Sequence, residues 1–210
     1  MNETGERRRR AGAKLALGMA GLLPQRGALC IAPIMEQAAR AYEKPIALIG
    51  LMGAGKSTIG RRLARRIGLP FVDADREIET AAGLTIAEIF ERYGEAHFRD
   101  GERRVLARLV EGPPRVIATG GGAFMDEATR ALILQRCIAI WLDAEVETLA
   151  ERVGRRDHRP LLRGKDPRVL LQSLAEARGP IYAEAHLIVR GGAVPHEKMV
   201  DRIVAALAGR

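Results

Sequence analysis

The stretch GLMGAGKS, residues 50–57, decides the fold. It fits the pattern G-x-x-x-x-G-K-[ST] and directly follows the short apolar run PIALI, residues 45–49. Glycines in this pattern let the backbone wrap around a phosphate group, and the helix starting near the second glycine adds the positive end of its dipole. The lysine reaches the β- and γ-phosphates, and the hydroxyl can bind Mg²⁺. The sequence therefore predicts a nucleotide site formed by Gly53, Ala54, Gly55, Lys56, Ser57 and Thr58.

Short apolar runs alternate with longer amphipathic stretches from residue 44 onward, which is typical of βα units and a parallel sheet. We expect five strands, at residues 45–49, 70–73, 115–118, 138–142 and 186–189. We expect helices at residues 56–67, 127–134, 146–153, 167–184 and 195–208, with a pair of helices across 85–110. Thr85 and Glu88 predict a capping box at the start of this pair, and Gly94 predicts the end of its first helix.

Composition limits the classes of protein to consider. A chain of 210 residues with 47% hydrophobic residues can build one domain with a real core. The net charge of +8 favours anionic partners, but with only 4% aromatic residues the chain has little material for stacking bases. Cys30 and Cys137 lie far apart without metal-ligand spacing. We therefore expect small anionic ligands, no nucleic acid, no zinc site and a reducing, cytoplasmic location.

Residues 1–43 differ from the rest of the chain. Residues 1–44 hold eight Lys or Arg and four Asp or Glu, so they contribute +4, half of the net charge of +8. The basic start and the apolar run at residues 13–23 resemble a weak signal peptide, but the run is too short to span a bilayer. We expect a disordered N-terminal extension, with Met35 as an alternative start and a targeting segment as the other interpretation, and a folded domain at residues 44–210.

Two aspartates follow the second predicted strand in FVDADRE, residues 71–77. Alternation along an extended chain would place Asp73 and Asp75 on one side, at the edge of the sheet where ligands bind. Such a pair can hold Mg²⁺ through water or accept a hydroxyl proton. Asp75 could instead cap the helix that follows, and the two roles can coexist.

Three further segments carry candidate residues. TGGG, residues 119–122, follows the third predicted strand, and three glycines in a row indicate either a close backbone approach or an ordinary loop. The charged segment 154–166 has the length of a functional lid. Spacing alone does not single out Arg99, Arg159 and Arg178, because isolated arginines usually lie on the solvated surface.

Taken together, the motifs resemble those of the shikimate kinase family. The loop at residues 50–58, FVDAD, FRDGE, TGGG, RPLL and ARGPIY occur in that family's order and at its approximate spacing. The resemblance covers about residues 44–210. It implies a three-layer P-loop kinase fold, α/β, with a five-stranded parallel sheet, helices on both faces and a mobile lid. It also implies transfer of the ATP γ-phosphate to the 3-hydroxyl of shikimate, in chorismate biosynthesis.

The resemblance assigns roles to individual residues. Asp75 would bind the ring hydroxyls of shikimate, Arg99 and Arg178 would hold its carboxylate, and the backbone at Gly121 and Gly122 would contact it. Bidentate guanidinium groups suit a planar carboxylate. On the nucleotide side, Lys56 and Arg159 would neutralise the phosphates, Arg152 would lie against adenine, and Ser57 and Asp73 would hold Mg²⁺. Asp75 would be a base or only orient the hydroxyl.

One segment departs from the family pattern, and the residues also bear on rival functions. The family often has a proline packed on adenine after the last strand, where this chain has Gly191 and Gly192, with Pro195 later. A gluconate kinase would not need Arg99 and Arg178. A GTPase is excluded, because its guanine-reading motif N-K-x-D needs an asparagine and the only asparagine in this chain is Asn2. A silent nucleotide-binding regulator would not need all the catalytic groups. We expect a monomer with no membrane partner.

Overall fold

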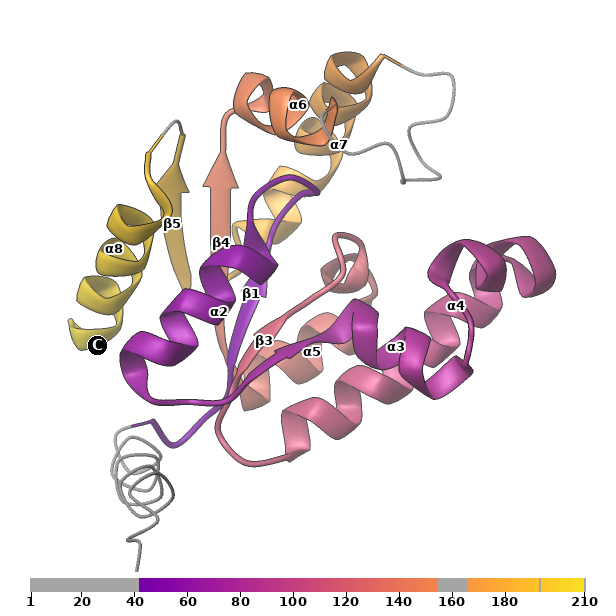
Figure 1. The fold of residues 1–210 in the computed structure, drawn as a ribbon, viewed down its shortest axis with the longest axis horizontal. Coiled ribbons are helices and arrows are strands. Elements are labelled where there is room, and N and C mark those ends of the chain that lie inside the picture. The colour runs from indigo at the N-terminus through magenta and orange to yellow at the C-terminus, as the bar shows by residue number, and fades with distance from the viewer. Residues whose placement is uncertain (1–41, 155–165, 193, 210) are drawn as a thin grey trace, which may run out of the picture.

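Five parallel strands form one sheet in the order β2-β3-β1-β4-β5 (Figure 1). The structure is a computed structural model that describes residues 42–154, 166–192 and 194–209. The strands are β1 (Ile46–Ile49), β2 (Phe71–Asp73), β3 (Val116–Ala118), β4 (Ile138–Ala144) and β5 (Leu187–Gly191). β1 and β3 are buried along their whole length, as expected for central strands covered on both faces, and this explains their uninterrupted apolar sequences.

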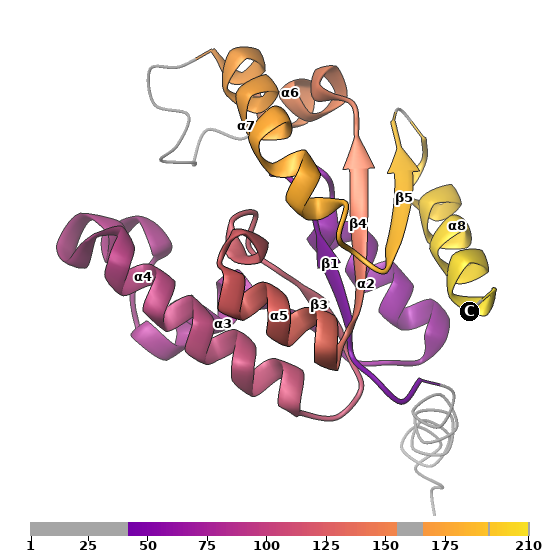
Figure 2. The ribbon, with the colours of Figure 1, turned by 180° about the vertical axis from the view of Figure 1, so that it is seen from behind.

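Helices cover both faces of the sheet, and the predicted three-layer arrangement is confirmed. Helices α2 and α8 lie together on one face, while α5, α7 and the second half of α4 lie on the other (Figures 1 and 2). The helices are α2 (Lys56–Ile67), α3 (Ala74–Ala82), α4 (Ile86–Glu111), α5 (Glu127–Arg136), α6 (Val146–Gly154), α7 (Pro167–Tyr182) and α8 (His196–Ala208), with a short 3₁₀ helix, η1 (Ala123–Met125).

Strand order places the site. β1 pairs with β3 on one side and with β4 on the other. The strand order therefore reverses at β1, with β2 and β3 on one side of it and β4 and β5 on the other. In open α/β sheets the crevice at such a switch point, beyond the carboxyl ends of the strands, is the usual ligand site. The loop 50–55 that leaves β1 lies at this crevice, and α2 begins directly after it.

Local signals set several helix ends as predicted. Thr85 accepts from the backbone N–H of Glu88 at 3.2 Å, and the Glu88 carboxylate accepts from the backbone N–H of Thr85 at 2.8 Å, which completes the capping box. Gly94 interrupts α4 with a non-helical φ of 79° and ψ of 176°, so the expected pair of helices is present as two helical segments that meet at this glycine. Asp166 caps α7 by accepting from the N–H of Arg168, and Pro167 takes the first helical position.

Several boundaries differ from the sequence-based prediction. β1, β2, β3 and β5 each begin one residue later than expected, while β4 and β5 each end two residues later. Helix α3 was missing from the expected set, and η1 was not anticipated. Because α3 starts at Ala74, Asp73 occupies the cap position and Asp75 lies in the first turn. The interpretation of Asp75 as the cap is therefore wrong, and strand alternation does not relate the two carboxylates.

Some predictions fall on parts of the chain that the structure does not describe. They are the proposed extension up to residue 41, including Met35, and the lid segment at residues 155–165 with Arg159. Among the described helices, none combines the length and the apolar character needed to cross a bilayer.

The packing of α2 on the sheet yields a test of stability. A Cβ atom at Gly60 would lie 2.7 Å from Cε2 of Phe71 and 3.1 Å from Cδ1 of Leu48. We expect Gly60→Ala to lower the free energy of unfolding by about 1–3 kcal/mol, because this crowding outweighs the better helix propensity of alanine. Urea denaturation measures the change.

Gly101 in α4 is the matched control. A Cβ atom there would meet no atom of the described residues within 4 Å, apart from its neighbours and its own helix backbone. Gly101→Ala should therefore raise the free energy of unfolding by roughly 0.5–1 kcal/mol. If both variants were stabilised to the same degree, the close packing of α2 on Phe71 would be refuted.

Candidate active site

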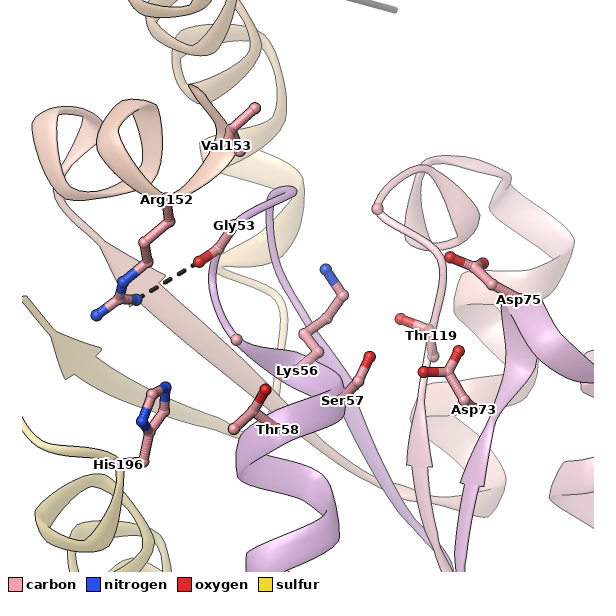
Figure 3. Close-up of a pocket in the computed structure, with 12 residues that line it drawn as sticks. Gly53, Lys56, Ser57, Thr58, Asp73, Asp75, Thr119, Arg152, Val153 and His196 are labelled. Carbon is pink, nitrogen blue, oxygen red and sulfur yellow. Dashed lines mark hydrogen bonds between the residues drawn. The ribbon is translucent and has the colours of Figure 1, made fainter. Parts of the chain in front are cut away.

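A polar pocket of about 410 Å³ opens above the loop 50–55 (Figure 3). Its walls come from the loop, the start of α2, the ends of β2 and β3, α6 and the start of α8. The lining includes the predicted residues Gly53, Gly55, Lys56, Ser57, Thr58, Asp73, Asp75, Gly121 and Arg152, together with Thr119, Val153 and His196. The predicted Ala54 is buried in the loop itself. The sequence thus identified most of this pocket from four separate segments.

The ammonium group of Lys56 lies over the loop. Its Nζ atom donates to the carbonyl oxygen of Gly50 at 2.8 Å and to that of Leu51 at 3.0 Å. These carbonyls hold the positive charge at the mouth of the loop, at the amino end of α2. A helix N-terminus with a lysine beside it is suited to bind an anion such as a phosphate. The loop therefore fits the phosphates of a nucleotide.

Asp73 and Asp75 face the loop from the other side of the pocket (Figure 3). Asp73 ends β2, and Asp75 projects from the first turn of α3. The hydroxyl of Ser57 lies between this pair and Lys56 (Figure 3). Mg²⁺ commonly binds one or two protein oxygens plus substrate phosphates and water, which Ser57 and Asp73 can provide. Among the described residues, no group of three His, Cys, Asp or Glu side chains is arranged to hold a metal ion.

Arg152 joins the loop to the segment after β5. It donates to the carbonyl oxygen of Gly53 at 3.4 Å and to that of Gly192 at 3.1 Å. Arg152 lines the pocket, and its contact with the base of a nucleotide stays a prediction. The segment after β5 is shorter than expected, because Gly191 still pairs with Ala144 of β4.

His196 is a pocket residue that sequence reasoning did not identify. It is the first residue of α8, and its imidazole lies beside Thr58 and Arg152 (Figure 3). Partial burial, with the positive charges of Arg62 and Arg152, lowers the pKa of His196 below its ordinary value of 6.5. A neutral imidazole at this wall adds no positive charge to a site that already contains Lys56 and Arg152.

A second pocket, of about 510 Å³, adjoins the first. It lies between α3, α4, the triple-glycine loop and α7, with apolar walls that include Phe90 and Phe98. It brings together all the residues predicted for the acceptor: Asp75, Arg99, Gly121, Gly122 and Arg178. Asp75 and Gly121 line both pockets. A molecule in the second pocket would therefore lie next to the phosphate end of the first.

Arg99 is held by two carboxylates of its own helix. Its Nη1 atom lies 2.7 Å from Oε2 of Glu102, a side chain that is 4% exposed, and its Nη2 atom lies 3.1 Å from Oε1 of Glu95, which is 66% exposed. The buried pair fixes the guanidinium, whereas an exposed ion pair contributes little. Glu102 was not predicted, although its i,i+3 spacing from Arg99 in FRDGE was a readable signal.

Arg178 and Tyr182 converge on the triple-glycine loop. Nη1 of Arg178 donates to the carbonyl oxygen of Gly121 at 2.8 Å, and the hydroxyl of Tyr182 donates to the same oxygen at 2.5 Å. Thr119, at the start of the loop, donates to the carbonyl oxygen of Leu48 in β1 at 3.0 Å. These bonds tie the loop to α7 and to the central strand.

Together, the phosphate-binding loop and the adjoining two-arginine pocket define the class of the protein as a P-loop kinase.

Comparisons with known proteins identify the family. The chain matches the family model for shikimate kinase over residues 52–208. It is 56% identical to a shikimate kinase of Zymomonas mobilis over 83% of this chain and 99% of that protein, and 57% identical to one of Caulobacter vibrioides over 83% and 87%. The structure of shikimate kinase from Acinetobacter baumannii in complex with shikimate superposes with a TM-score of 0.78 at 38% identity, covering 81% of this chain and 97% of that one.

The chain belongs to the shikimate kinase family, as its motifs predicted. It is therefore an ATP-using kinase that requires Mg²⁺. The predicted α/β P-loop kinase fold is confirmed both by the sheet and by this structural similarity.

The buried carboxyl of Glu102 yields a test by pH. Burial raises the pKa of Glu102 above its ordinary value of 4.5, more than the bond to Arg99 lowers it. A raised pKa means that the folded state binds this proton more tightly, so its contribution favours folding at low pH and is lost as the pH rises through the folded-state pKa. Wild type loses this contribution as the pH rises from 4.5 through the folded-state pKa of Glu102, and Glu102→Gln has none to lose. We therefore expect the free energy of unfolding of Glu102→Gln minus that of wild type to increase over this pH range, as measured by urea titrations.

Glu95→Gln is the control for this test, because Glu95 also pairs with Arg99 but is exposed. Its stability relative to wild type should change less with pH. A Glu102→Gln difference that stays constant across the range would contradict the burial effect.

Proposed function

We propose that this kinase transfers the γ-phosphoryl group of ATP to the 3-hydroxyl of shikimate, with the nucleotide in the loop pocket and shikimate in the two-arginine pocket. The observation that carries this proposal is that Asp75 and Gly121 line both pockets. An acceptor hydroxyl beside Asp75 is then adjacent to the phosphate end of the nucleotide. The family assignment and the shikimate complex of the Acinetobacter baumannii relative support the choice of acceptor.

The chemistry requires alignment and charge neutralisation more than covalent help. The hydroxyl oxygen of the acceptor forms a bond to the γ-phosphorus, the bond from that phosphorus to the β,γ-bridging oxygen breaks, and ADP leaves. Asp75 orients the hydroxyl and is placed to take its proton. Lys56 and the backbone of the loop stabilise the negative charge on the phosphoryl oxygens. Ser57 and Asp73 would hold Mg²⁺, which would supply further positive charge at the phosphates.

The acceptor pocket matches a small carboxylate. Arg99 and Arg178 each lie at the pocket with a guanidinium group, and the apolar walls suit a carbon ring. Glu95 is exposed, so a substrate carboxylate can replace it at Arg99 at small cost. Glu102 would remain in place and keep the guanidinium oriented.

Other features of the proposal come from the sequence and stay predictions. Arg159 would contribute charge to the phosphates, and Arg152 would contact the base. We propose a monomeric protein of the cytoplasm, where its nucleotide is available, with no nucleic-acid or membrane partner. A coupled assay for ADP with shikimate as acceptor, and gluconate as comparator, tests the function directly. Turnover with gluconate but not with shikimate would refute the proposal.

Lys56 provides the test of the phosphate site. Lys56→Ala should lower kcat by at least about 100-fold, because the transferred phosphoryl group loses a direct positive partner. Lys44→Ala is the matched control, since Lys44 donates to the carbonyl of Gln135 away from both pockets and should leave kcat unchanged. Near wild-type turnover by Lys56→Ala would remove the lysine from the mechanism.

The two arginines provide the test of the acceptor site. Arg99→Lys and Arg178→Lys should each raise the KM for shikimate by roughly 10-fold or more while changing the KM for ATP much less, because lysine keeps the charge but loses the bidentate geometry. Arg104→Lys, at a 71% exposed position of the same helix as Arg99, should change neither constant. Equal increases in both constants would indicate a general loss of structure instead.

A further inference from the structure

Tyr182 is hydrogen-bonded to the loop that lines both pockets. Its hydroxyl donates to the carbonyl oxygen of Gly121 in this loop. We propose that Tyr182 is a positioning residue for the acceptor: its hydroxyl fixes the Gly121–Gly122 peptide and, through the shared carbonyl, the guanidinium of Arg178. This inference rests on the proposed acceptor site.

The ring of Tyr182 is held firmly enough to act as an anchor. The side chain is 1% exposed. Its ring centroid lies 5.7 Å from that of Trp141 on β4 and 6.4 Å from that of Phe124 on η1. Burial also raises the pKa of Tyr182, so the hydroxyl keeps its proton and remains a donor. A donor fixed by the sheet and by η1 can define where the triple-glycine loop lies.

The loop needs such an anchor because its three glycines have no side chains of their own to pack. The Gly120 carbonyl accepts from the N–H of Ala123 at 3.3 Å, and the Gly121 carbonyl accepts from Arg178 and Tyr182. In a trans peptide the N–H points opposite to the C=O. Turning the Gly121 carbonyl toward α7 therefore turns the N–H of Gly122 away from α7. The orientation of this peptide at the acceptor pocket follows from the bonds to its carbonyl.

Arg178 and Tyr182 both bond the Gly121 carbonyl but have different roles in the proposed site. They lie four residues apart and so share one face of α7. Arg178 would also bind the acceptor carboxylate, so its bond to Gly121 competes with its bonds to the substrate. Tyr182 has no second task in the pocket. Its bond to Gly121 can persist whether the acceptor is present or absent, and it leaves Arg178 oriented with its other N–H groups available.

Tyr182→Phe tests this role, because it removes the hydroxyl and keeps the ring packing. We expect the KM for shikimate to rise about 3- to 10-fold, the range for one lost hydrogen bond, with the KM for ATP changed less than 2-fold. Tyr93→Phe is the matched control, since Tyr93 is 56% exposed on α4, and it should leave both constants unchanged. A KM for shikimate within 2-fold of wild type in Tyr182→Phe would overturn the proposal, whatever happens to stability.

Two further variants separate positioning from packing. In an Arg178→Lys background, Tyr182→Phe should raise the KM for shikimate by a smaller factor than in wild type, because both act on Gly121. Replacing Tyr182 with 4-aminophenylalanine keeps a donor at the same place and should restore at least half of the lost affinity on a logarithmic scale. Independent effects of the two substitutions, or no rescue by the amino group, would overturn the proposal. A wild-type enzyme inactive on shikimate would instead refute the proposed function.

Discussion

No side chain fits where the phosphate-binding loop passes the end of β4 and the side of α6, and the rest of the site depends on this close approach. A Cβ atom at Gly50 would lie 2.8 Å from the carbonyl oxygen of Leu142, and one at Gly53 would lie 2.9 Å from Cγ2 of Val153. Both glycines have positive φ, at 136° and 83°. Because the loop lies so close to α6, the Gly53 carbonyl can accept from Arg152, while the Gly50 carbonyl accepts from Lys56 at the start of α2. The backbone of one loop thus orients side chains from two helices.

The acceptor side is organised by charge balance within a partly apolar cavity. Arg99 enters this cavity with its charge already compensated by Glu102, which is buried, and by Glu95, which is exposed. Arg178 is oriented by a neutral carbonyl instead. Preformed orientation of this kind avoids reorganisation when the substrate binds. The two arginines are therefore positioned by different means, one by an ion pair within its helix and the other by a loop from a distant part of the chain.

The sequence predicted the five strands, most of the helices, most residues of the loop pocket and a minority of those that line the second pocket, because these depend on local periodicity and on motifs at strand ends. It missed features that tertiary packing creates. Pro45 and Pro70 have carbonyls that accept from Ile138 and Val116 but lack an N–H group, so their strands begin one residue later. β4 extends to Ala144 because β5 pairs with it there. Tyr182 and His196 become site residues only when α7 and α8 meet loops from other segments.

In the proposed acceptor site, binding would be an exchange of carboxylates at Arg99. In the structure, the Glu95 carboxylate accepts from Nε and Nη2 of Arg99, so part of this guanidinium is paired within its own helix. An incoming carboxylate can displace this exposed partner, whose loss returns a well-solvated side chain to water. Displacing Glu102 would leave a buried carboxylate without its partner, at a much higher cost. If Arg99 binds the substrate as proposed, the difference in exposure between the two glutamates would determine which contact yields and which continues to hold Arg99 in place.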